Sequence, residues 1–411
     1  MRVAVNVEQL LSPSPGGIGR HAAQLVMLLG SLPPVDEPVP FVARHRPGEL
    51  AAALAGSGLG PTAVVLPFPR RPLYETWVRF GLPPLALGAP DLRDLDVVHA
   101  PSVAVPGRPG APLVVTVHDA AAELHPEAFT PRGRRWHSRG VAAAARRADL
   151  VVAPTHAAAE EIAAHTPVPA ARIRVVHHAL TAPPPDADRG RDGERLSAAG
   201  VDGVPYVLWI GSLEPRKGVG TLVEAMAALG RPGRRGARLV LAGYAGWLPE
   251  GLVPAAARGD LGADLVQLGR VDDATLWALY RGAAVFAFPS RHEGFGMPPL
   301  EAMSQGCPVV ASDLPALREV LGAAACYAPP GDVEAWSAAL GSLLDGSADL
   351  AALAAAGRDR AGRYTPEAFV AATRSVYREV VGDGPGLGAR GAGARRRPRE
   401  HCEPKGYVDD T

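Results

Sequence analysis

The chain repeats one pattern twice: short apolar runs rich in valine alternate with longer stretches that suit amphipathic helices. Strands of a parallel sheet have this character, because helices cover both faces of the sheet and bury it. The alternation therefore predicts doubly wound α/β domains. A chain of 411 residues also exceeds what one core usually fills, so we expect two domains.

The first alternating series covers residues 1–180, which we predict to form one Rossmann-like domain. Its predicted strands are Val3–Val7, Val97–His99, Leu113–Val117 and Leu150–Ala153, and its predicted helices include Ile18–Leu29 and Arg132–Arg147. Residues 181–203 are polar and rich in proline and glycine, as linkers are. We therefore expect a linker there, with a second domain after it.

The second series, over residues 204–363, repeats the pattern. Its predicted strands are Tyr206–Ile210, Arg238–Ala242, Leu265–Leu268, Val285–Phe288 and Pro308–Ala311. Its predicted helices are Gly220–Leu229, Asp273–Gly282, Pro298–Gln305 and Leu314–Val320. The same alternation on both sides of a linker predicts two similar domains that face each other across a cleft.

The C-terminal part of the chain has a different character. A helix is predicted over Pro366–Val381, with a proline in its first turn, and residues 364–381 are expected to cross back to the first domain. Residues 382–411 are glycine-rich and then basic, which predicts disorder. The cluster Arg395–Arg397 in this tail suits contact with anionic lipid or nucleic acid, although a solvated tail is the more common case.

Composition and charge exclude several classes of protein. The formal net charge is zero, which argues against a nucleic-acid-binding protein. The three cysteines (Cys307, Cys326 and Cys402) are isolated, so we expect no disulfide framework and no zinc site. No apolar run approaches the roughly 18 residues of a membrane-spanning helix, and the N-terminus has no signal-peptide pattern. We expect a cytoplasmic protein.

The most informative segment covers residues 289–320, PSRHEGFGMPPLEAMSQGCPVVASDLPALREV. A glycine-containing loop follows a predicted strand and leads into a helix near Pro298. Free backbone N–H groups and the dipole at such a helix start favour an anion, and the glycines allow a diphosphate or sugar to approach closely. Glu293 and Glu301 place two carboxylates there, and these acceptors suit sugar or ribose hydroxyls.

This segment resembles the signature of the family 4 retaining glycosyltransferases, the group 1 transferases. Two glutamates with seven intervening residues are weak evidence alone, but here they stand in E-G-F-G-x-P-x-L-E-A followed by G-x-P-V-V-A-S. The resemblance implies the GT-B fold, two Rossmann-like domains facing a cleft. It also implies that Glu301 binds the ribose of the donor nucleotide and that Glu293 lies beside the donor sugar. The loop residues expected to hold the sugar and phosphates are Gly294, Phe295, Gly296 and Met297.

A second segment, LWIGSLEPRKGVGTLVEAM from Leu208, begins as a strand and ends as a helix. Arg216 and Lys217 in its loop are placed to neutralise a leaving diphosphate without a metal. The segment resembles the family's G-x-L-x-x-x-K-G motif, whose basic pair binds the donor phosphates, and Ser212 falls inside this motif. An exposed Arg–Lys pair is usually a solvated surface pair, but its place after the first strand of the second domain favours the phosphate role.

The segment SPSPGGIGRHAAQLVMLL in the first domain has glycines before a predicted helix. It differs from the G-x-G-x-x-G dinucleotide fingerprint, and a glycine-rich loop is a weak signal by itself. In the family, a G-G-I-G-R loop closes over donor and acceptor. We therefore predict donor contacts from Gly17 and Gly19, and a charge near the phosphates or the acceptor from Arg20. A plain flexible turn is the alternative.

The segment VVTVHDAAAELHPEAF places His118 and Asp119 where a predicted strand ends, the edge at which open α/β sheets bind ligands. The resemblance implies that His118 lies near the transferred sugar, and we predict a supporting or acceptor-side role for Asp119. His99, in VVHAP, is a further acceptor-side candidate, although a histidine at a strand end is more often structural. The predicted catalytic residues are His118, Glu293, Arg216 and Lys217.

A fifth match, VQLGRVDDATLWALY, resembles the turn where the family's nucleotide base packs on main chain, and it adds Val271 to the predicted donor site. Residues 41–90 match the family only loosely and are expected to face the acceptor. They hold a basic and aromatic set: Arg70, Arg71, Tyr74, Trp77 and Arg79. Such a set suits a carbohydrate or an anionic membrane, although basic helix faces are usually only solvated.

These motifs predict a retaining hexosyltransferase that works without a metal or other cofactor. We expect a nucleotide diphosphate sugar as donor, GDP-mannose first and a UDP-sugar second. The acceptor is expected to be a carbohydrate, a lipid-linked molecule or a natural product, because the motifs look most like those of bacterial mannosyltransferases and rhamnosyltransferases of polysaccharide assembly. Peripheral contact with the inner face of the membrane is compatible with the basic residues, and nucleic acid is not an expected partner.

Three alternatives stay open. Another GT-B enzyme, such as a sugar-nucleotide epimerase or an inverting transferase, would use the same donor site. A phosphorylase of this fold would carry pyridoxal on a lysine, which is an unfavourable fit because the chain has only Lys217 and Lys405. A catalytically silent scaffold that binds nucleotide sugars is the alternative from another class, and the intact donor motifs argue against it.

Overall fold

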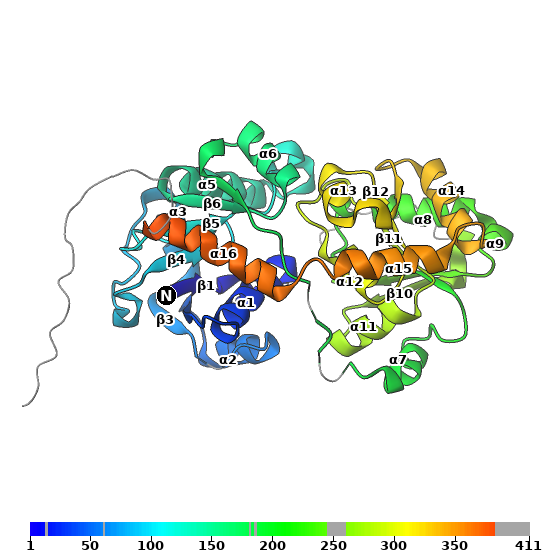
Figure 1. The fold of residues 1–411 in the computed structure, drawn as a ribbon, viewed down its shortest axis with the longest axis horizontal. Coiled ribbons are helices and arrows are strands. Elements are labelled where there is room, and N and C mark those ends of the chain that lie inside the picture. Colours follow the sequence, from blue (N-terminus) through cyan, green and yellow to red (C-terminus); the bar gives the residue numbers. More distant parts are fainter. Residues whose placement is uncertain (13–14, 61, 181, 185–186, 245–259, 383–411) are drawn as a thin grey trace, which may run out of the picture.

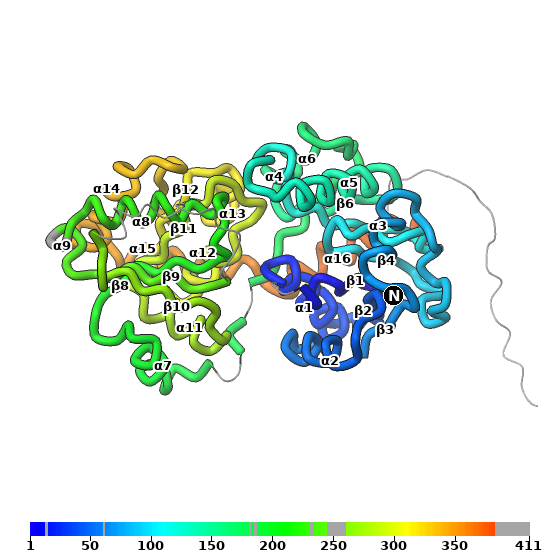
Figure 2. Tube along the Cα trace, turned by 180° about the vertical axis from the view of Figure 1, so that it is seen from behind, coloured from blue at the N-terminus to red at the C-terminus, as the bar shows by residue number. Residues whose placement is uncertain are grey.

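The computed structural model describes residues 1–12, 15–60, 62–180, 182–184, 187–244 and 260–382. They form two lobes side by side, each a parallel sheet between layers of helices (Figures 1 and 2). Each lobe buries one core on each face of its sheet: in β1 of the first lobe, Ala4 faces one core, whereas Val3 and Val5 face the other. The predicted fold class, two Rossmann-like α/β domains, is confirmed.

The first sheet has seven parallel strands in the order β3-β2-β1-β4-β5-β6-β7. Its strands are β1 (Arg2–Asn6), β2 (Glu37–Arg44), β3 (Val64–Pro69), β4 (Val97–Ala100), β5 (Leu113–Thr116), β6 (Leu150–Ala153) and β7 (Ile173–Val175). Its helices are α1 (Gly16–Ser31), α2 (Pro47–Gly56), α3 (Arg70–Phe80), α4 (Ala121–Leu124), α5 (Pro131–Arg147) and α6 (His156–His165). The four predicted strands agree with β1, β4, β5 and β6 to within one residue at each end.

Strand β2 was not predicted, because Pro38 and Pro40 argue against a strand inside a sheet. The amide of Glu37 donates to the carbonyl of Met1, so the amides of alternate residues from Glu37 point toward β1. The two proline nitrogens, which carry no hydrogen, therefore face β3. Pairing with β3 begins only at Phe41, beyond both prolines, so no ladder hydrogen bond is lost.

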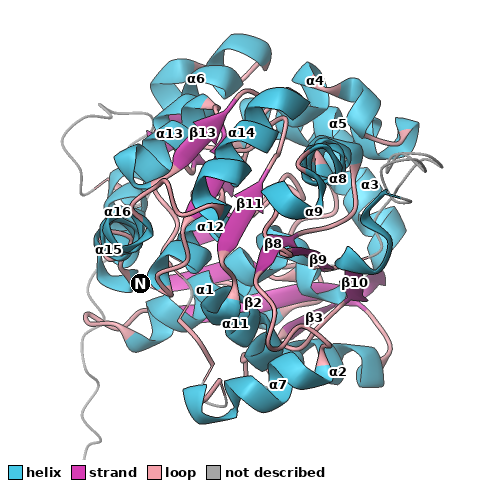
Figure 3. Ribbon diagram, turned by 90° about the vertical axis from the view of Figure 1, so that its right-hand side faces the viewer, coloured by secondary structure: helices cyan, strands magenta, loops and turns pink. Residues whose placement is uncertain are grey.

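The second sheet has six parallel strands in the order β10-β9-β8-β11-β12-β13. Its strands are β8 (Tyr206–Ile210), β9 (Arg238–Ala242), β10 (Leu265–Gly269), β11 (Val285–Phe288), β12 (Val309–Ser312) and β13 (Cys326–Ala328). Its helices are α8 (Val219–Ala228), α9 (Gly230–Gly233), α11 (Asp273–Gly282), α12 (Met297–Ser304), α13 (Pro315–Leu321), α14 (Val333–Leu344) and α15 (Leu350–Ala361). Figure 3 shows these helices around the strands of the sheet.

Short 3-10 helices connect many of these elements. They are η1 (Glu8–Leu11), η2 (Pro90–Leu92), η3 (Pro126–Ala128), η4 (Ala170–Arg172), η5 (Arg189–Arg191), η6 (Pro215–Lys217), η7 (Gly262–Asp264) and η8 (Gly322–Ala324). Two of them matter for the site: η1 follows β1, and η6 carries the basic pair that follows β8.

The interval predicted as a linker, residues 181–203, is not irregular throughout. It contains η5 and α7 (Asp192–Ala198), and α7 packs on α11. Arg281 of α11 forms a bidentate ion pair with Asp192, with both N–O distances 2.6 Å. The polar, glycine-rich composition predicted a linker. In the structure, the Arg281–Asp192 ion pair and the contact of Leu196 with the second core dock part of this interval as a helix.

The last described helix, α16 (Pro366–Val381), lies on the first lobe, while α15 before it lies on the second (Figure 1). Its Tyr377 hydroxyl lies 2.7 Å from His99 Nδ1, and its buried Arg374 forms an ion pair with Asp36 over 2.6 Å. The predicted disordered tail lies, from residue 383, outside the described residues. Among the helices described, none is long and apolar enough to cross a bilayer.

Candidate functional site

Each sheet reverses its strand order at a pair of neighbouring central strands, β1 with β4 and β8 with β11. Ligands of doubly wound sheets bind outside the carboxyl ends of such strand pairs. Arg216 and Lys217 follow β8, and residues 289–296 follow β11. The residues predicted to bind the donor therefore lie at the switch point of the second sheet.

The loop after β11 rests directly on the first domain. A Cβ atom built on Gly294 would overlap the carbonyl oxygen of His118, so only glycine fits this approach. The Thr155 hydroxyl donates to the Gly294 carbonyl over 2.9 Å. Because His118 follows β5 and Thr155 follows β6, the loop lies against the carboxyl edge of the first sheet. The structure thus brings His118 and the donor loop together.

The carboxylate of Glu293 lies between the two predicted phosphate-binding cations. Lys217 Nζ is 2.6 Å from Glu293 Oε1, and Arg216 Nη1 is 3.7 Å from Oε2. Burial would raise the pKa of the Glu293 carboxyl, but the Lys217 and Arg216 charges hold it below its usual value. The two cations share this carboxylate, and Arg216 Nη2 also lies 4.0 Å from Glu214 Oε2, so carboxylates hold both cations in place.

Backbone amides face the same region at the start of α12. Gly296 caps this helix in the left-handed conformation, with φ of 93°, and no side chain caps the helix. Within the described residues, the amides of Phe295, Gly296 and Met297 donate to no acceptor. Free N–H groups at a helix start bind anions. Together with the basic pair, they form a site suited to a diphosphate.

Glu301 lies one turn into α12 and is almost completely buried, at 2% exposure. The Tyr280 hydroxyl of α11 donates to Glu301 Oε2 over 2.9 Å. Arg20 of the first domain reaches across the cleft: its Nη1 is 3.7 Å from Glu301 Oε1, and its Nη2 is 2.7 Å from Asp273 Oδ1. Arg20 was predicted near the phosphates or the acceptor, but the structure places it at the carboxylate predicted to bind ribose.

The predicted loop around Gly17 and Gly19 is helical. Helix α1 begins at Gly16, two residues before the predicted start at Ile18, so both glycines lie in its first turn. Gly19 is buried, and a Cβ atom there would overlap Pro15. Gly17 is exposed, with open space where its Cβ would stand. Of the two, only Gly17 is therefore accessible to a ligand.

The partner of His118 fixes which of its ring nitrogens carries the proton. Nε2 lies 3.0 Å from the Pro101 carbonyl, which can only accept, so Nε2 carries the proton. Burial lowers the pKa of this imidazole, which keeps it neutral near pH 7. Nδ1 is then a hydrogen-bond acceptor. A neutral histidine whose acceptor nitrogen has no donor among the described residues suits a sugar hydroxyl.

Asp119, Ser212 and Val271 lie at the edges of the site. Asp119 accepts from the Ala121 amide over 3.0 Å. Burial alone would raise the pKa of its carboxyl, but the charges of Arg216 and His292 and the Ala121 hydrogen bond together lower it. The Ser212 carbonyl accepts from the Glu214 amide and shapes the loop after β8. Val271, between β10 and α11, packs against the second core. Their places agree with supporting contacts to a ligand in the cleft.

His99 is placed differently. It is buried in β4 at 2% exposure, with Nδ1 2.7 Å from the Tyr377 hydroxyl and Nε2 2.8 Å from Thr116 Oγ1. Burial lowers the pKa of His99 to about 3. Both ring nitrogens are therefore engaged within the protein, and the acceptor-side role predicted for His99 is not supported by its position. It joins α16 to the first sheet.

Several residues at the site were not predicted. His21 and His178 are buried beside His118, with ring centroids 5.3 and 5.4 Å from it. His21 stands four positions before Leu25 on the buried face of α1, so helical periodicity was an available signal. No sequence signal was available for Tyr280, because it contacts Glu301 only in the folded structure. In the described residues, no group of three or more His, Cys, Asp or Glu side chains is placed to hold a metal.

Further polar contacts hold the two domains together near the site. Glu319 of α13 accepts from the amides of His156 and Ala157 at the start of α6, over 2.9 and 3.0 Å. It also lies 2.9 Å from His177 Nε2. His292 pairs with Glu161 of α6 over 2.8 Å. These contacts describe a closed arrangement of the two domains.

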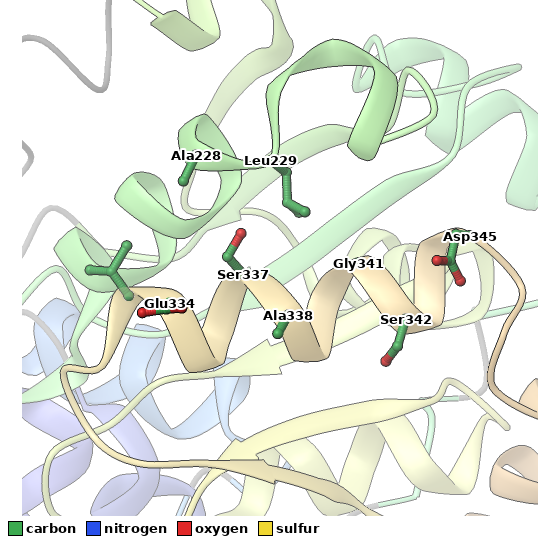
Figure 4. A pocket seen from close by; sticks show the side chains of 9 residues that line it. Ala228, Leu229, Glu334, Ser337, Ala338, Gly341, Ser342 and Asp345 are labelled. Atoms are coloured by element: carbon green, nitrogen blue, oxygen red, sulfur yellow. The ribbon is translucent and has the colours of Figure 1, made fainter.

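A separate hollow of about 650 Å³ lies between α8 and α14 (Figure 4). It is lined by small and apolar residues such as Ala228, Leu229, Ser337 and Gly341. Ala228 and Leu229 stand at the C-terminal end of α8, whereas Lys217 precedes its N-terminal end. None of the predicted site residues lines this hollow.

Comparison with known proteins identifies the chain's relatives. Residues 204–346 match the glycosyl transferases group 1, and residues 15–181 match glycosyltransferase family 4. The O-antigen chain mannosyltransferase B of Escherichia coli is 31% identical over 368 residues, which cover 84% of this chain and 92% of that protein. The MMP alpha-(1->4)-mannosyltransferase of Mycolicibacterium hassiacum is 30% identical over 308 residues, which cover 70% of this chain and 71% of that protein.

Two solved structures share the fold. Anabaena HepE in complex with UDP and glucose has a TM-score of 0.68 and 18% identity, covering 91% of this chain and 98% of that chain. Sucrose-phosphate synthase of Thermosynechococcus elongatus has a TM-score of 0.69 and 21% identity, covering 93% of this chain and 99% of that chain. The chain therefore belongs to the group 1 glycosyl transferases of glycosyltransferase family 4, and it is a glycosyltransferase with the GT-B fold.

Proposed function

We propose that this enzyme is a retaining hexosyltransferase that transfers mannose from GDP-mannose to a carbohydrate, lipid-linked or natural-product acceptor, without a metal. One observation carries the proposal: Arg216 and Lys217 share the Glu293 carboxylate beside the free amides at the start of α12. The choice of mannose rests on relatives named as mannosyltransferases. A UDP-sugar is the second candidate, supported by structural neighbours solved with UDP.

The proposed reaction uses these groups on the leaving diphosphate. As the bond from the anomeric carbon to the phosphate oxygen breaks, negative charge grows on the diphosphate. Fixed cations and free amides stabilise that charge without a rearrangement of solvent. The acceptor oxygen bonds to the same face of the sugar, and its proton goes to the departing phosphate oxygen. Contact of the Gly294 loop with the first domain excludes water that would hydrolyse the donor.

A ligand screen tests the donor assignment. Purified protein is heated with GDP, UDP, TDP or ADP and with their common sugar conjugates. A ligand that binds only the folded state stabilises it by about 2.7 kcal/mol at 100 times its dissociation constant. We expect GDP and GDP-mannose to raise the unfolding temperature most. A rise with UDP compounds alone would assign the donor to that class, and no rise with any nucleotide would contradict the donor site.

His118 tests the sugar side of the proposal. His118→Ala removes the acceptor nitrogen that we assign to a sugar hydroxyl, so transfer should fall by about tenfold, the effect of one hydrogen bond at the transition state. Nucleoside diphosphate affinity should stay within about twofold, since the phosphate and ribose groups lie in the second domain. His165→Ala, at the exposed end of α6, is the control. Transfer equal in the two variants would remove His118 from the mechanism.

A further inference from the structure

A second cavity lies in the first domain, at the carboxyl ends of β1, β2 and β3. It has a volume of about 790 Å³. Leu10 and Ser12 line it after β1, His45 and Glu49 after β2, and Arg70 and Arg71 after β3. Its position on the same sheet edge as His118 places it on the first-domain side of the active site.

A buried carboxylate forms the floor beneath this cavity. Glu8, at 4% exposure, lies 2.7 Å from His45 Nε2 and 3.0 Å from Arg70 Nε. Its other oxygen accepts from the Ala43 amide and the Tyr74 hydroxyl, 2.8 and 3.3 Å away. Arg70 is thus held by its Nε, and within the described residues its two Nη groups have no acceptor. These groups are oriented donors for a ligand.

The start of α3 concentrates positive charge at the mouth of the cavity. Arg70 and Arg71 are its first two residues, and Pro69 before them offers no side-chain cap. The dipole of a helix disfavours cations at its N-terminus, so two arginines there oppose the field of the 11-residue helix. Arg71 is exposed and has no ion pair among the described residues, whereas the nearby Glu49 pairs with Arg46 at 3.9 Å. An anion would relieve this repulsion.

Part of the remaining lining is apolar, and this part continues toward the donor site. Leu10, Pro69 and Pro72 supply hydrocarbon walls beside the arginines. Leu10 also lies against Gly19 in α1, the helix whose Arg20 reaches Glu301. An anionic group with an organic body fits such a cavity better than a free ion does.

We propose that this cavity binds the phosphoryl group of the acceptor substrate, through Arg70 and Arg71. Arginine suits this ligand because its planar fork matches phosphate oxygens. The acceptor is then a phosphate ester, either a soluble sugar phosphate or the headgroup of a phospholipid-like carrier. The assignment of the ligand as acceptor rests on the proposed transferase function, whereas the phosphate site itself does not.

Binding of inorganic phosphate tests the site. Full-length protein is first saturated with the nucleoside diphosphate that stabilises it most, which occupies the donor site, and phosphate is then titrated by calorimetry. Arg71→Gln should weaken phosphate binding by about tenfold, the effect of one charge-assisted hydrogen bond. Arg79 was predicted to face the acceptor together with Arg70 and Arg71, but it stands at the other end of α3 and does not line the cavity. Arg79→Gln also removes an exposed charge, so it is the matched control and should bind phosphate as the unaltered protein does.

Two further arms separate the sources of phosphate. Glycerol phosphate represents soluble esters, and phosphatidylcholine vesicles with and without phosphatidylglycerol represent a lipid headgroup. Arg71→Gln should weaken binding of whichever of these two ligands the unaltered protein binds. Equal phosphate affinity in the Arg71 and Arg79 variants, or no saturable binding in the unaltered protein, would overturn the proposal. If nucleotides bind and phosphate does not, the cavity assignment alone fails. If no nucleotide binds, the transferase proposal fails, and the Arg71 and Arg79 comparison still decides the phosphate site.

Discussion

Single residues at the donor site take different electrostatic settings although their sequence context is similar. Glu293 and Glu301 both flank one helix start, yet Glu293 lies between Lys217 and Arg216 of its own domain, whereas Glu301 lies between the Tyr280 hydroxyl and Arg20 of the first domain. A carboxylate between two cations remains charged and orients them, whereas Glu301 is held by a hydroxyl of its own domain and a cation of the other. These settings fit the phosphate side and the ribose side of a nucleotide.

Tyr280→Phe tests the ribose side. Loss of the hydroxyl frees Glu301 to rotate, so affinity for the nucleoside diphosphate should fall by about three- to tenfold. The loss should shrink for the 2′,3′-dideoxy nucleotide, because that analogue cannot donate to Glu301. Tyr206→Phe removes a comparable buried hydroxyl, bonded to the Leu279 carbonyl over 2.8 Å, and is the control. Equal losses in the two variants, or equal losses for both nucleotides, would contradict a role through the ribose.

At the scale of elements, the loop after β11 takes part both in the proposed phosphate site and in the contact with the first domain. Its amides face the proposed phosphate site, and its carbonyl at Gly294 accepts a hydrogen bond from the first domain. The overlap expected at Gly294 involves backbone of His118, which has no rotamer to change. A side chain at this position must therefore move the loop or separate the domains.

Gly294→Ala should lower transfer by about tenfold or more, because reacting groups misplaced by about 1 Å lose much of their rate. Nucleoside diphosphate affinity should change less, because Lys217 and Glu301, which we assign to the phosphates and the ribose, do not contact the His118 backbone. Gly193→Ala, in open space on α7, is the matched control. Unchanged transfer in Gly294→Ala would show that the close approach to His118 has no part in the reaction.

The whole molecule is held together by segments distant in sequence. Helix α16 returns to the first sheet through Tyr377 and Arg374, and Glu319 joins α13 to the start of α6. Buried histidines occupy the interior between these elements. Burial disfavours the charged imidazole and lowers the pKa of His21, His99 and His178, so each is neutral in the fold.

Stability should therefore fall in acid. The unfolded chain binds a proton at His99 below a pKa of 6.5, while the folded protein does not until about 3, so stability present above pH 6.5 is lost as the pH falls toward 3. At pH 5 this one group costs about 2 kcal/mol. The urea concentration at the unfolding midpoint should fall less between pH 7.5 and pH 5 in His99→Gln than in the unaltered protein. Tyr377→Phe keeps the imidazole and should lower the midpoint without flattening the slope; parallel curves for His99→Gln would contradict the assignment.

The sequence determined the elements whose signals are local. The bounds of β8, β9, β11, α11 and α16 agree with prediction, because valine-rich runs and a proline in a first turn report on their own neighbourhood. Strands β7 and β13 were missed because each has three residues and most of their side chains are only partly buried. The family motifs likewise located Glu293, Glu301, Arg216 and Lys217, because each motif lies within one strand–loop–helix unit.

Only the tertiary structure decided which of these groups meet across the domains. Arg20 lies 253 residues from Asp273 in sequence, and His292 lies 131 residues from Glu161. His99 carried the same signal as His118, a histidine at a strand end, yet α16 covers one and the Gly294 loop covers the other. No local pattern encodes such pairings, because they depend on how two separately folded sheets place their carboxyl edges against each other.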